Sequence, residues 1–172
     1  MELIWWVVLW GSVAALLWVY FLYPTLLWVL APHHEPSAPE DRDLPGVSLI
    51  LAVHNEEKSL RQKMANCLAI EYPTDRLDII VVDDGSTDGT AEILRSLEPR
   101  GINAVFLPQR SGKTEAQNRA VALAHQPILF FTDATTTHST DVLRVIVRRF
   151  SDPDVGCVSG RAVFREATPA AT

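Results

Sequence analysis

Polar side chains follow three short apolar runs of this chain. Segment 54–56 (HNE) follows VSLILAV, segment 83–86 (DDGS) follows LDIIVV, and segment 133–135 (DAT) follows PILFFT. In an open α/β sheet, ligands bind in the crevice outside the carboxyl ends of the strands. Carboxylates that separate strands bring to that edge can hold a divalent cation or contact a nucleotide. The sequence therefore predicts one polar site built from distant parts of the chain.

The acidic pair Asp83 and Asp84 stands where the second apolar run has to turn. Adjacent carboxylates repel each other, so we expect each to have its own partner. We expect Asp83 to accept a hydrogen bond from a ribose hydroxyl or a base N–H, as acidic residues of dinucleotide folds do. The alternative is turn chemistry alone, because Asp-Gly is a strong turn signal and Ser86 or Asp88 can cap the following helix.

Asp133 can supply the carboxylate oxygen that a divalent cation bridging a diphosphate requires. Thr135 points the same way from an extended backbone, although a hydroxyl is a weaker ligand than a carboxylate. We expect His54 to present its backbone or its ring to the ligand, without a role in proton transfer.

Lys113 lies in segment 109–114 (QRSGKT), which leads into a helix N-terminus. Backbone N–H groups at such a terminus suit phosphate, and the lysine adds a cation; the alternative is a solvated loop. Gly-Lys-Thr also ends a Walker A loop, but that motif needs glycine where Leu107 stands, so a P-loop nucleotidase is not expected.

Strands and helices are expected to alternate from residue 47 onward. Apolar runs typical of buried strands cover residues 47–53, 77–84, 103–107, 127–133 and 155–160, and helical segments cover residues 55–70 (capped by Asn55), 90–97, 111–126 and 139–150. This alternation predicts an α/β fold with a mostly parallel, doubly wound sheet. The two cysteines fall in a predicted helix (Cys67) and a predicted strand (Cys157), which indicates reduced core residues rather than a disulfide.

Residues 1–31 form a separate apolar segment. No charged side chain occurs from Leu3 to Ala31. A hydrocarbon core needs about 20 apolar residues in a helix, so this segment predicts a single transmembrane helix. The alternative is a cleaved signal peptide, whose apolar core has only about 7–15 residues. We expect Pro24 to kink this helix or to end it.

Residues 32–46 are rich in proline and acidic, which predicts a linker, and residues 47–172 form the globular part. Glu2 and the linker account for −4 of the net charge of −6, which leaves −2 for the globular part. Without a basic patch, nucleic acid is not an expected partner.

Five segments between residues 47 and 165 resemble a family 2 glycosyltransferase. They are AVHNEE, VVDDGSTDGT, SGKTEAQNRA, FFTDATT and VGCVSGR, in this order. The resemblance implies the GT-A fold with helices on both faces of the sheet, a nucleoside-diphosphate sugar donor (UDP- or GDP-linked), Mg²⁺ or Mn²⁺, and inverting transfer to a lipid or polysaccharide acceptor. Many membrane-bound members begin with a hydrophobic segment that contains a Tyr-Pro like Tyr23-Pro24. Because such donors are cytosolic, we expect the globular domain on the cytoplasmic side of the membrane.

The resemblance also implies roles for residues that match the family's motifs. Ala52, His54 and Glu56 would line the nucleotide pocket, Asp83 would hold the nucleobase with Asp84 beside it, Lys113 would orient the nucleotide or diphosphate, and Asp133 would begin the metal-binding Asp-x-Asp motif. Thr135 departs from this motif, because the family usually shows Asp or Asn there.

Members of the family continue past the Val-Ser-Gly strand into an acceptor-binding half, which supplies the catalytic carboxylate base. We expect these 172 residues to be a fragment that binds the donor and transfers little or no sugar. A non-catalytic module that binds nucleotide sugar or acts as a scaffold is the alternative. A receiver-like signalling domain is disfavoured, because its acidic pair would follow the first strand, where segment 54–56 stands.

Overall fold

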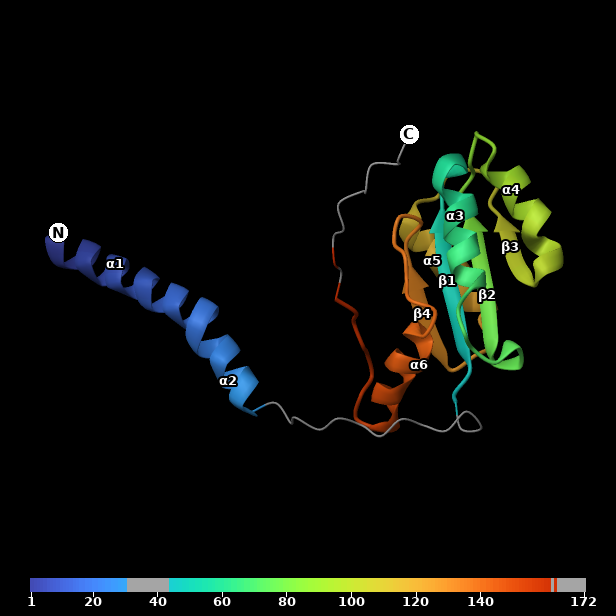
Figure 1. The fold of residues 1–172 in the computed structure, drawn as a ribbon. Coiled ribbons are helices and arrows are strands. Elements are labelled where there is room, and N and C mark those ends of the chain that lie inside the picture. Colours follow the sequence, from blue (N-terminus) through green and yellow to red (C-terminus); the bar gives the residue numbers. More distant parts are fainter. Residues whose placement is uncertain (31–43, 162, 164–172) are drawn as a thin grey trace, which may run out of the picture. The chain divides into compact units, whose positions relative to one another are not determined.

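The computed structural model describes residues 1–30, 44–161 and 163. The chain divides into two units, Met1–Glu35 and Pro36–Thr172 (Figure 1). The predicted linker falls mostly on residues outside the described ranges.

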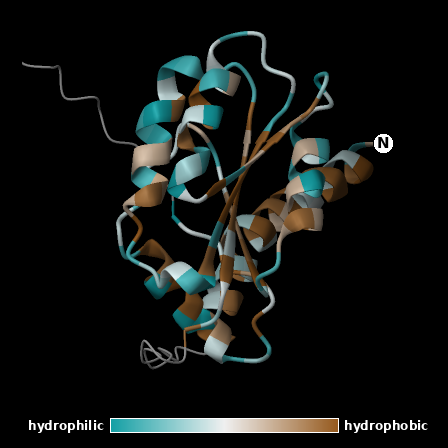
Figure 2. Cartoon of the chain, turned by 90° about the vertical axis from the view of Figure 1, so that its right-hand side faces the viewer, coloured by the Kyte–Doolittle hydropathy of each residue, from teal (hydrophilic) through white to brown (hydrophobic). Residues whose placement is uncertain are grey.

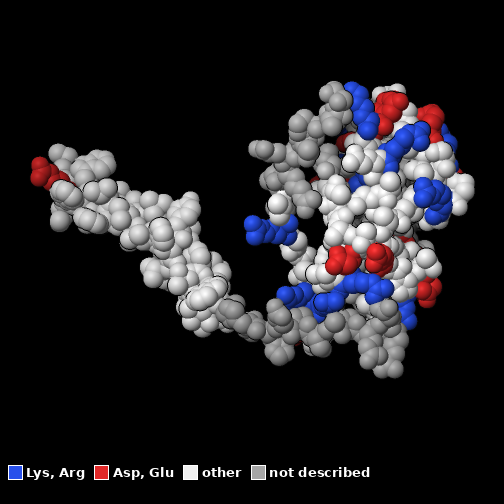
Figure 3. Space-filling view, viewed as in Figure 1, with Lys and Arg blue, Asp and Glu red and all other residues white. Residues whose placement is uncertain are grey.

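The first unit is an apolar helix in three parts: α1 (Glu2–Leu17), a π-helical turn (Trp18–Leu22) and α2 (Tyr23–Leu30). The run Glu2–Leu30 is long and apolar enough to cross a membrane, by length and composition. Figure 3 shows no basic residue along it and acidic colour only at one end. These features agree with the predicted transmembrane helix.

Pro24 does not end this helix, so that alternative of the sequence prediction is wrong. Proline removes a backbone N–H and crowds the carbonyl one turn earlier. The chain widens into the π-helical turn immediately before Pro24, and the Tyr23 N–H bonds the Trp18 carbonyl five residues back. The wider turn accommodates the proline, and the helix continues to Leu30.

The second unit contains a four-stranded sheet in the described part of the chain, with the order β3-β2-β1-β4. The strands are β1 (Val47–Val53), β2 (Leu77–Asp83), β3 (Ile102–Phe106) and β4 (Ile128–Thr132). All three pairings are parallel, with Val47 opposite both Leu77 and Ile128. The central strand β1 is almost entirely buried, as its continuous apolar run predicts.

Helices cover both faces of this sheet (Figure 2). One face packs against α3 (Glu57–Leu68), α4 (Thr90–Leu97) and α6 (Val142–Val147), and the other face packs against α5 (Lys113–Leu123). Short 3-10 turns cover Thr74–Arg76, Glu98–Arg100 and Arg148–Ser151. The predicted fold class is therefore confirmed.

Side chains of β1 alternate between the two cores. Leu49 and Leu51 join the larger core, which includes Leu60 and Met64 of α3. Ile50 joins the smaller core with Ile80, Val82 and the α5 residues Ala116 and Ala120. Each fully buried leucine or isoleucine contributes about 1.5–3 kcal/mol relative to exposure, and the small alanines let α5 approach the sheet.

The chain enters the domain at the amino end of β1. Leu44 is buried in the larger core. The Tyr72 hydroxyl donates to the Pro45 carbonyl, and the Arg76 guanidinium donates to the Leu44 carbonyl. The last residues of the predicted linker are therefore fixed to the domain.

Two predictions of local structure are wrong. Residues 155–160 form no strand, and Cys157 there is exposed. A strand needs a partner for its backbone groups, whereas β4 pairs only with β1 among the described residues, and Gly156 and Gly160 weaken any extended segment. Asn55 does not cap α3 as predicted, because it adopts a left-handed backbone (φ 55°) and Glu56 takes the N-cap position. The predicted helix over residues 139–150 is shortened to α6 and the 3-10 turn after it.

Candidate functional site

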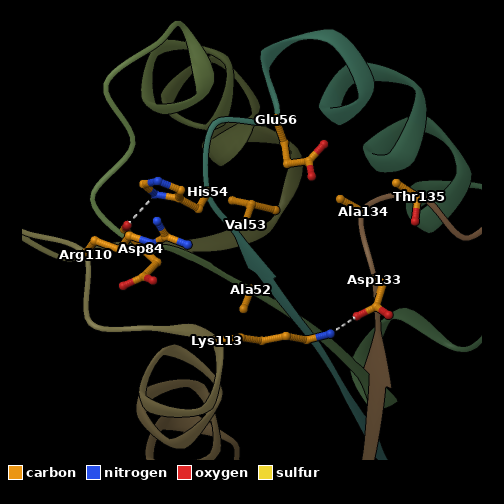
Figure 4. Close-up of a pocket in the computed structure, with 10 residues that line it drawn as sticks. All are labelled: Ala52, Val53, His54, Glu56, Asp84, Arg110, Lys113, Asp133, Ala134 and Thr135. Atoms are coloured by element: carbon orange, nitrogen blue, oxygen red, sulfur yellow. Dashed lines mark hydrogen bonds and ion pairs between the residues drawn. The ribbon is translucent and has the colours of Figure 1, made fainter.

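A pocket lies where the strand order reverses. The chain passes from β1 to β2 on one side and later adds β4 on the other side of β1. In open α/β sheets, such a switch point forms the crevice that binds ligands. The pocket is lined by Ala52, Val53, His54, Glu56, Asp84, Arg110, Lys113, Asp133, Ala134 and Thr135 (Figure 4). The structure thus brings together all the predicted site residues except Asp83.

The segment between β2 and α4, which contributes Asp84 to the pocket, caps the start of α3. The free backbone N–H groups at the start of this helix donate to side chains of the loop: Asn55 to Ser86 Oγ (2.9 Å), Glu56 to Thr90 Oγ1 (2.9 Å) and Glu57 to Asp88 Oδ2 (3.2 Å). Asp88 Oδ1 also accepts the N–H of Thr90, the first residue of α4, at 3.0 Å, although Gly89 takes the N-cap position of that helix. Hydrogen bonds to Thr90, Glu57 and its own backbone hold the pKa of Asp88 below its usual range.

Asp84 fixes the start of α5. Its carboxylate accepts the backbone N–H groups of Ser111 (2.6 Å) and Gly112 (2.8 Å), and the residue is only 3% exposed. Gly85 adopts φ +63°, and a Cβ there would lie 2.6 Å from the Arg110 nitrogen. Only glycine therefore lets the loop after β2 approach the loop before α5 this closely. The sequence predicted that backbone N–H groups at this helix start would bind phosphate. In the structure, these two N–H groups donate to the Asp84 carboxylate instead.

Asp83 lies within its own turn. Its Oδ1 accepts the Ser86 N–H at 3.1 Å and also the Ser86 hydroxyl, and the residue is buried. This arrangement is the turn chemistry that the sequence left open for Asp83. A contact between Asp83 and a nucleobase stays a prediction.

The His54 ring faces the pocket in a defined orientation. Its Nδ1 lies 2.7 Å from the Asp84 carbonyl oxygen. Because a carbonyl can only accept, Nδ1 carries the proton. In the neutral ring, Nε2 therefore remains an acceptor.

Lys113 and Asp133 meet across the open end of β1. The lysine extends past Ala52, and its Nζ lies 2.5 Å from Asp133 Oδ1 (Figure 4). Both side chains are more than half exposed, at 59% and 54%. An exposed ion pair is worth only about 0–1 kcal/mol, so either partner can be exchanged for a ligand group.

Arg110 is a lining residue that the sequence reasoning missed. An exposed loop arginine gives no periodic signal. Its position between the end of β3 and the Ser111-Gly112-Lys113 segment is the signal that could have placed it at the pocket.

The donor chemistry of Asp133 and Thr135 fits a hard divalent cation only in part. Among the residues that the structure describes, no group of three or more His, Cys, Asp or Glu could hold a metal ion. Mg²⁺ is commonly bound through one or two carboxylates together with substrate phosphates and water. One carboxylate and one hydroxyl at the end of β4 therefore fit a cation that arrives with a diphosphate.

The chain matches the family model "Glycosyl transferase family 2" over residues 48–170. It is 30% identical over 125 residues to the poly-beta-1,6-N-acetyl-D-glucosamine synthase of Staphylococcus aureus (strain COL), covering 72% of this chain and 30% of that protein. The synthase of the same name from Staphylococcus epidermidis is 30% identical over 128 residues, which cover 73% of this chain and 31% of the relative. The chain thus spans about a third of the length of these curated relatives.

Solved structures show the same architecture. A mannosyltransferase from Pyrobaculum calidifontis, in complex with GDP-Man and Mn²⁺, matches with a TM-score of 0.69 and 31% identity, over 86% of this chain and 46% of that chain. TarS 1-349 of S. aureus in complex with UDP-GlcNAc matches with a TM-score of 0.58 and 23% identity, over 70% of this chain and 37% of its own. These matches confirm the predicted GT-A fold, and the chain belongs to glycosyl transferase family 2.

Proposed function

We propose that this chain binds a nucleoside-diphosphate sugar as the donor-binding part of a membrane-anchored, inverting glycosyltransferase. One observation carries the proposal: a pocket at the switch point of the sheet combines two cationic side chains with an exchangeable carboxylate. A diphosphate needs the cations, and a cation bridging that diphosphate needs the carboxylate.

Lys113 and Arg110 are the groups that neutralise the diphosphate in this proposal. Lys113 is held by Asp133 alone among the side-chain contacts of Figure 4. When phosphate oxygens enter, the ammonium turns from the carboxylate to the phosphate, and Asp133 becomes free to bind a cation.

Asp133 and Thr135 would hold Mg²⁺ or Mn²⁺ together with the diphosphate oxygens. The bound ion would stabilise the negative charge that develops on the leaving diphosphate. The similar mannosyltransferase was solved with GDP-Man and Mn²⁺, which supports this assignment.

The nucleoside would lie along the wall formed by Ala52, His54 and Asp84. His54 Nε2 can accept a hydrogen bond from a ribose hydroxyl or a base N–H. Glu56 borders the same pocket, and its carboxylate accepts the Ser59 hydroxyl. Asp83 can contact a base only by an oxygen not committed to Ser86, and whether the base is uracil or guanine is left to the experiment below.

The acceptor and the membrane complete the proposal. The S. aureus and S. epidermidis relatives are named as synthases of a polysaccharide, which supports a polysaccharide or lipid-linked acceptor. The apolar helix Glu2–Leu30 would anchor the chain with the domain on the cytoplasmic side, where donor sugars are made. We assign no general base among the described residues.

The test is calorimetric titration of the full chain in detergent with UDP and with GDP, each with and without Mn²⁺. We expect one nucleotide to bind, and Mn²⁺ to tighten its binding at least about tenfold, which corresponds to about 1.4 kcal/mol. Asp133→Ala should abolish the effect of Mn²⁺. Asp154→Ala removes an exposed carboxylate outside the pocket and should behave as the parent chain. If neither nucleotide binds to the folded chain, the proposed function is wrong.

A further inference from the structure

A buried ammonium lies directly behind the pocket-lining end of β4. Lys63 of α3 is only 3% exposed. Its Nζ donates to Thr132 Oγ1 (2.7 Å) and to the Thr136 carbonyl (2.8 Å), and it lies 3.4 Å from Thr136 Oγ1. All three contacts are made to the two residues that flank the segment Asp133–Thr135.

The chain after β4 folds around this ammonium. The Thr136 N–H and hydroxyl both donate to the Asp133 carbonyl, at 3.2 and 2.9 Å. Thr132 Oγ1 lies 3.0 Å from Thr136 Oγ1 and 2.6 Å from His138 Nε2. These contacts close a tight turn, and Asp133 and Thr135 of this turn line the pocket.

A second residue of the same helix holds the far end of this turn. Asn66 Nδ2 donates to the His138 carbonyl (2.8 Å), and the His138 N–H donates to Asn66 Oδ1 (2.9 Å). The His138 ring also packs edge-on against Phe130, with ring centroids 5.1 Å apart. Lys63 and Asn66 are three residues apart and lie on one face of α3, so this face is hydrogen-bonded to the turn at two points.

A charged residue at this position is costly for the fold. Burial lowers the pKa of Lys63, an effect that the negative charge of Asp133 opposes. A buried charge usually stabilises a fold less than an apolar side chain of similar size would. The neighbouring Met64 shows that α3 accepts such a side chain in the core. The ammonium therefore has a use other than packing.

We propose that Lys63 is a positioning residue of the donor site, whose ammonium holds the turn after β4 so that Asp133 and Thr135 face the pocket together. The part that concerns metal and nucleotide rests on the proposed function. The part that concerns the shape of the turn does not.

The positioning role predicts that Mn²⁺-dependent and metal-free nucleotide binding respond differently to the loss of Lys63. Asp133 and Thr135 can bind one cation only if both keep their orientation. Lys113 and Arg110, which also line the pocket, would contact the diphosphate without depending on the turn after β4. Loss of Lys63 should therefore weaken the Mn²⁺-dependent part of nucleotide binding and leave metal-free binding nearly intact.

The first measurement is amide hydrogen exchange on the full chain, comparing Lys63→Met with Lys58→Met. Lys58 is an exposed lysine of the same helix and provides the matched control. In Lys63→Met we expect exchange over residues 132–138 to become at least about tenfold faster, with no change in β1 and β2. Unchanged exchange in the turn would overturn the proposal, whether or not the chain binds nucleotide.

The second measurement is the ratio of nucleotide dissociation constants without and with Mn²⁺. We expect this ratio to fall about tenfold in Lys63→Met and to keep its parent value in Lys58→Met. An equal loss of metal-free and metal-dependent binding would show a general structural role and overturn the proposal. If the parent chain binds no nucleotide, the proposed function fails, while the exchange experiment still decides the role of Lys63 in the turn.

Thr136→Val provides a variant that keeps the buried lysine. It removes the hydroxyl contacts to Lys63 and Asp133 but retains the carbonyl that accepts from the ammonium. We expect a fall in the ratio of about threefold, in the same direction as for Lys63→Met. Should Lys63→Met fail to fold, an unchanged ratio and unchanged exchange in Thr136→Val would overturn the proposal.

Discussion

Asp84 and Asp133 each follow a strand at the same edge of the sheet, yet their surroundings are opposite. Asp84 is 3% exposed, and its carboxylate accepts two backbone N–H groups at the start of α5. The Asp133 side chain is 54% exposed, and its carboxylate pairs with the exposed ammonium of Lys113. A carboxylate that backbone groups saturate is part of the scaffold, whereas one held by an exposed lysine can exchange its partner for a ligand.

The comparison predicts its largest effect in unfolding free energy. Asp84→Ala leaves two N–H groups without their charged acceptor, so we expect a loss of about 3 kcal/mol. Asp133→Ala removes an exposed ion pair, so we expect a change within about 1 kcal/mol. Urea unfolding of both variants, followed by far-ultraviolet circular dichroism, measures the difference.

The choice of probe matters because all five tryptophans lie in the apolar helix, between Trp5 and Trp28. Intrinsic tryptophan fluorescence therefore does not report on the domain. Asp154→Ala is the control for the loss of an exposed carboxylate. Equal destabilisation by Asp84→Ala and Asp133→Ala would contradict the distinction between scaffold and ligand carboxylates.

Substitution of Asp83 is expected to change the unfolding free energy by an intermediate amount. Its Oδ1 accepts two hydrogen bonds from Ser86, so Asp83→Asn and Ser86→Ala should each cost about 1 kcal/mol of unfolding free energy. We expect neither variant to change nucleotide affinity by more than about threefold, which the titration with UDP and GDP measures. A tenfold loss of affinity in Asp83→Asn alone would restore the nucleobase contact predicted from the sequence.

The smallest expected effect is a pH dependence of the melting temperature. It arises from His138 on the β4 side of the pocket and not from the Asp84 side. Burial, and then the charge of Lys63, lower the pKa of His138 from its ordinary value of 6.5. The unfolded chain therefore takes up this proton first, and stability is lost as the pH falls through that range. We expect the melting temperature to fall as the pH drops through and below the ordinary histidine pKa of 6.5.

A glutamine at this position tests the origin of that fall. His138→Gln keeps a hydrogen-bonding nitrogen but cannot titrate, so the pH dependence should become shallower. His125→Gln, at an exposed position, should leave the dependence unchanged. A parallel fall in the parent chain and in His138→Gln would show that another group is responsible.

Most of the fold followed from the apolar runs. The four strands of the described sheet begin and end within one residue of their predicted bounds, because a buried parallel strand is a short continuous apolar segment. The segment 155–160 also contains apolar residues, but it has no partner in the described sheet. Pairing is a property of the whole fold, which a single run of residues does not contain.

The site was predictable where topology alone positions a residue. His54, Asp133 and Thr135 reach the pocket because they follow strands that flank the switch point. Hydrogen-bond partners were not predictable in this way. The sequence does not show that the Asp84 carboxylate meets the backbone after β3. Nor does it show that Lys63, 69 residues before Thr132, donates a hydrogen bond to that residue at the end of β4.

The entry of the chain at Leu44 has a mechanical consequence. The side chains of Tyr72 and Arg76 donate hydrogen bonds to the Pro45 and Leu44 carbonyls at the amino end of β1. The pocket lies at the other end of this seven-residue strand, about 20 Å away. A pull on the chain at residue 44 is resisted by those two side chains and by the ladder of β1, whose hydrogen bonds are loaded in shear. Tension applied at residue 44 would therefore load the amino end of the sheet before it reaches the pocket at the carboxyl end.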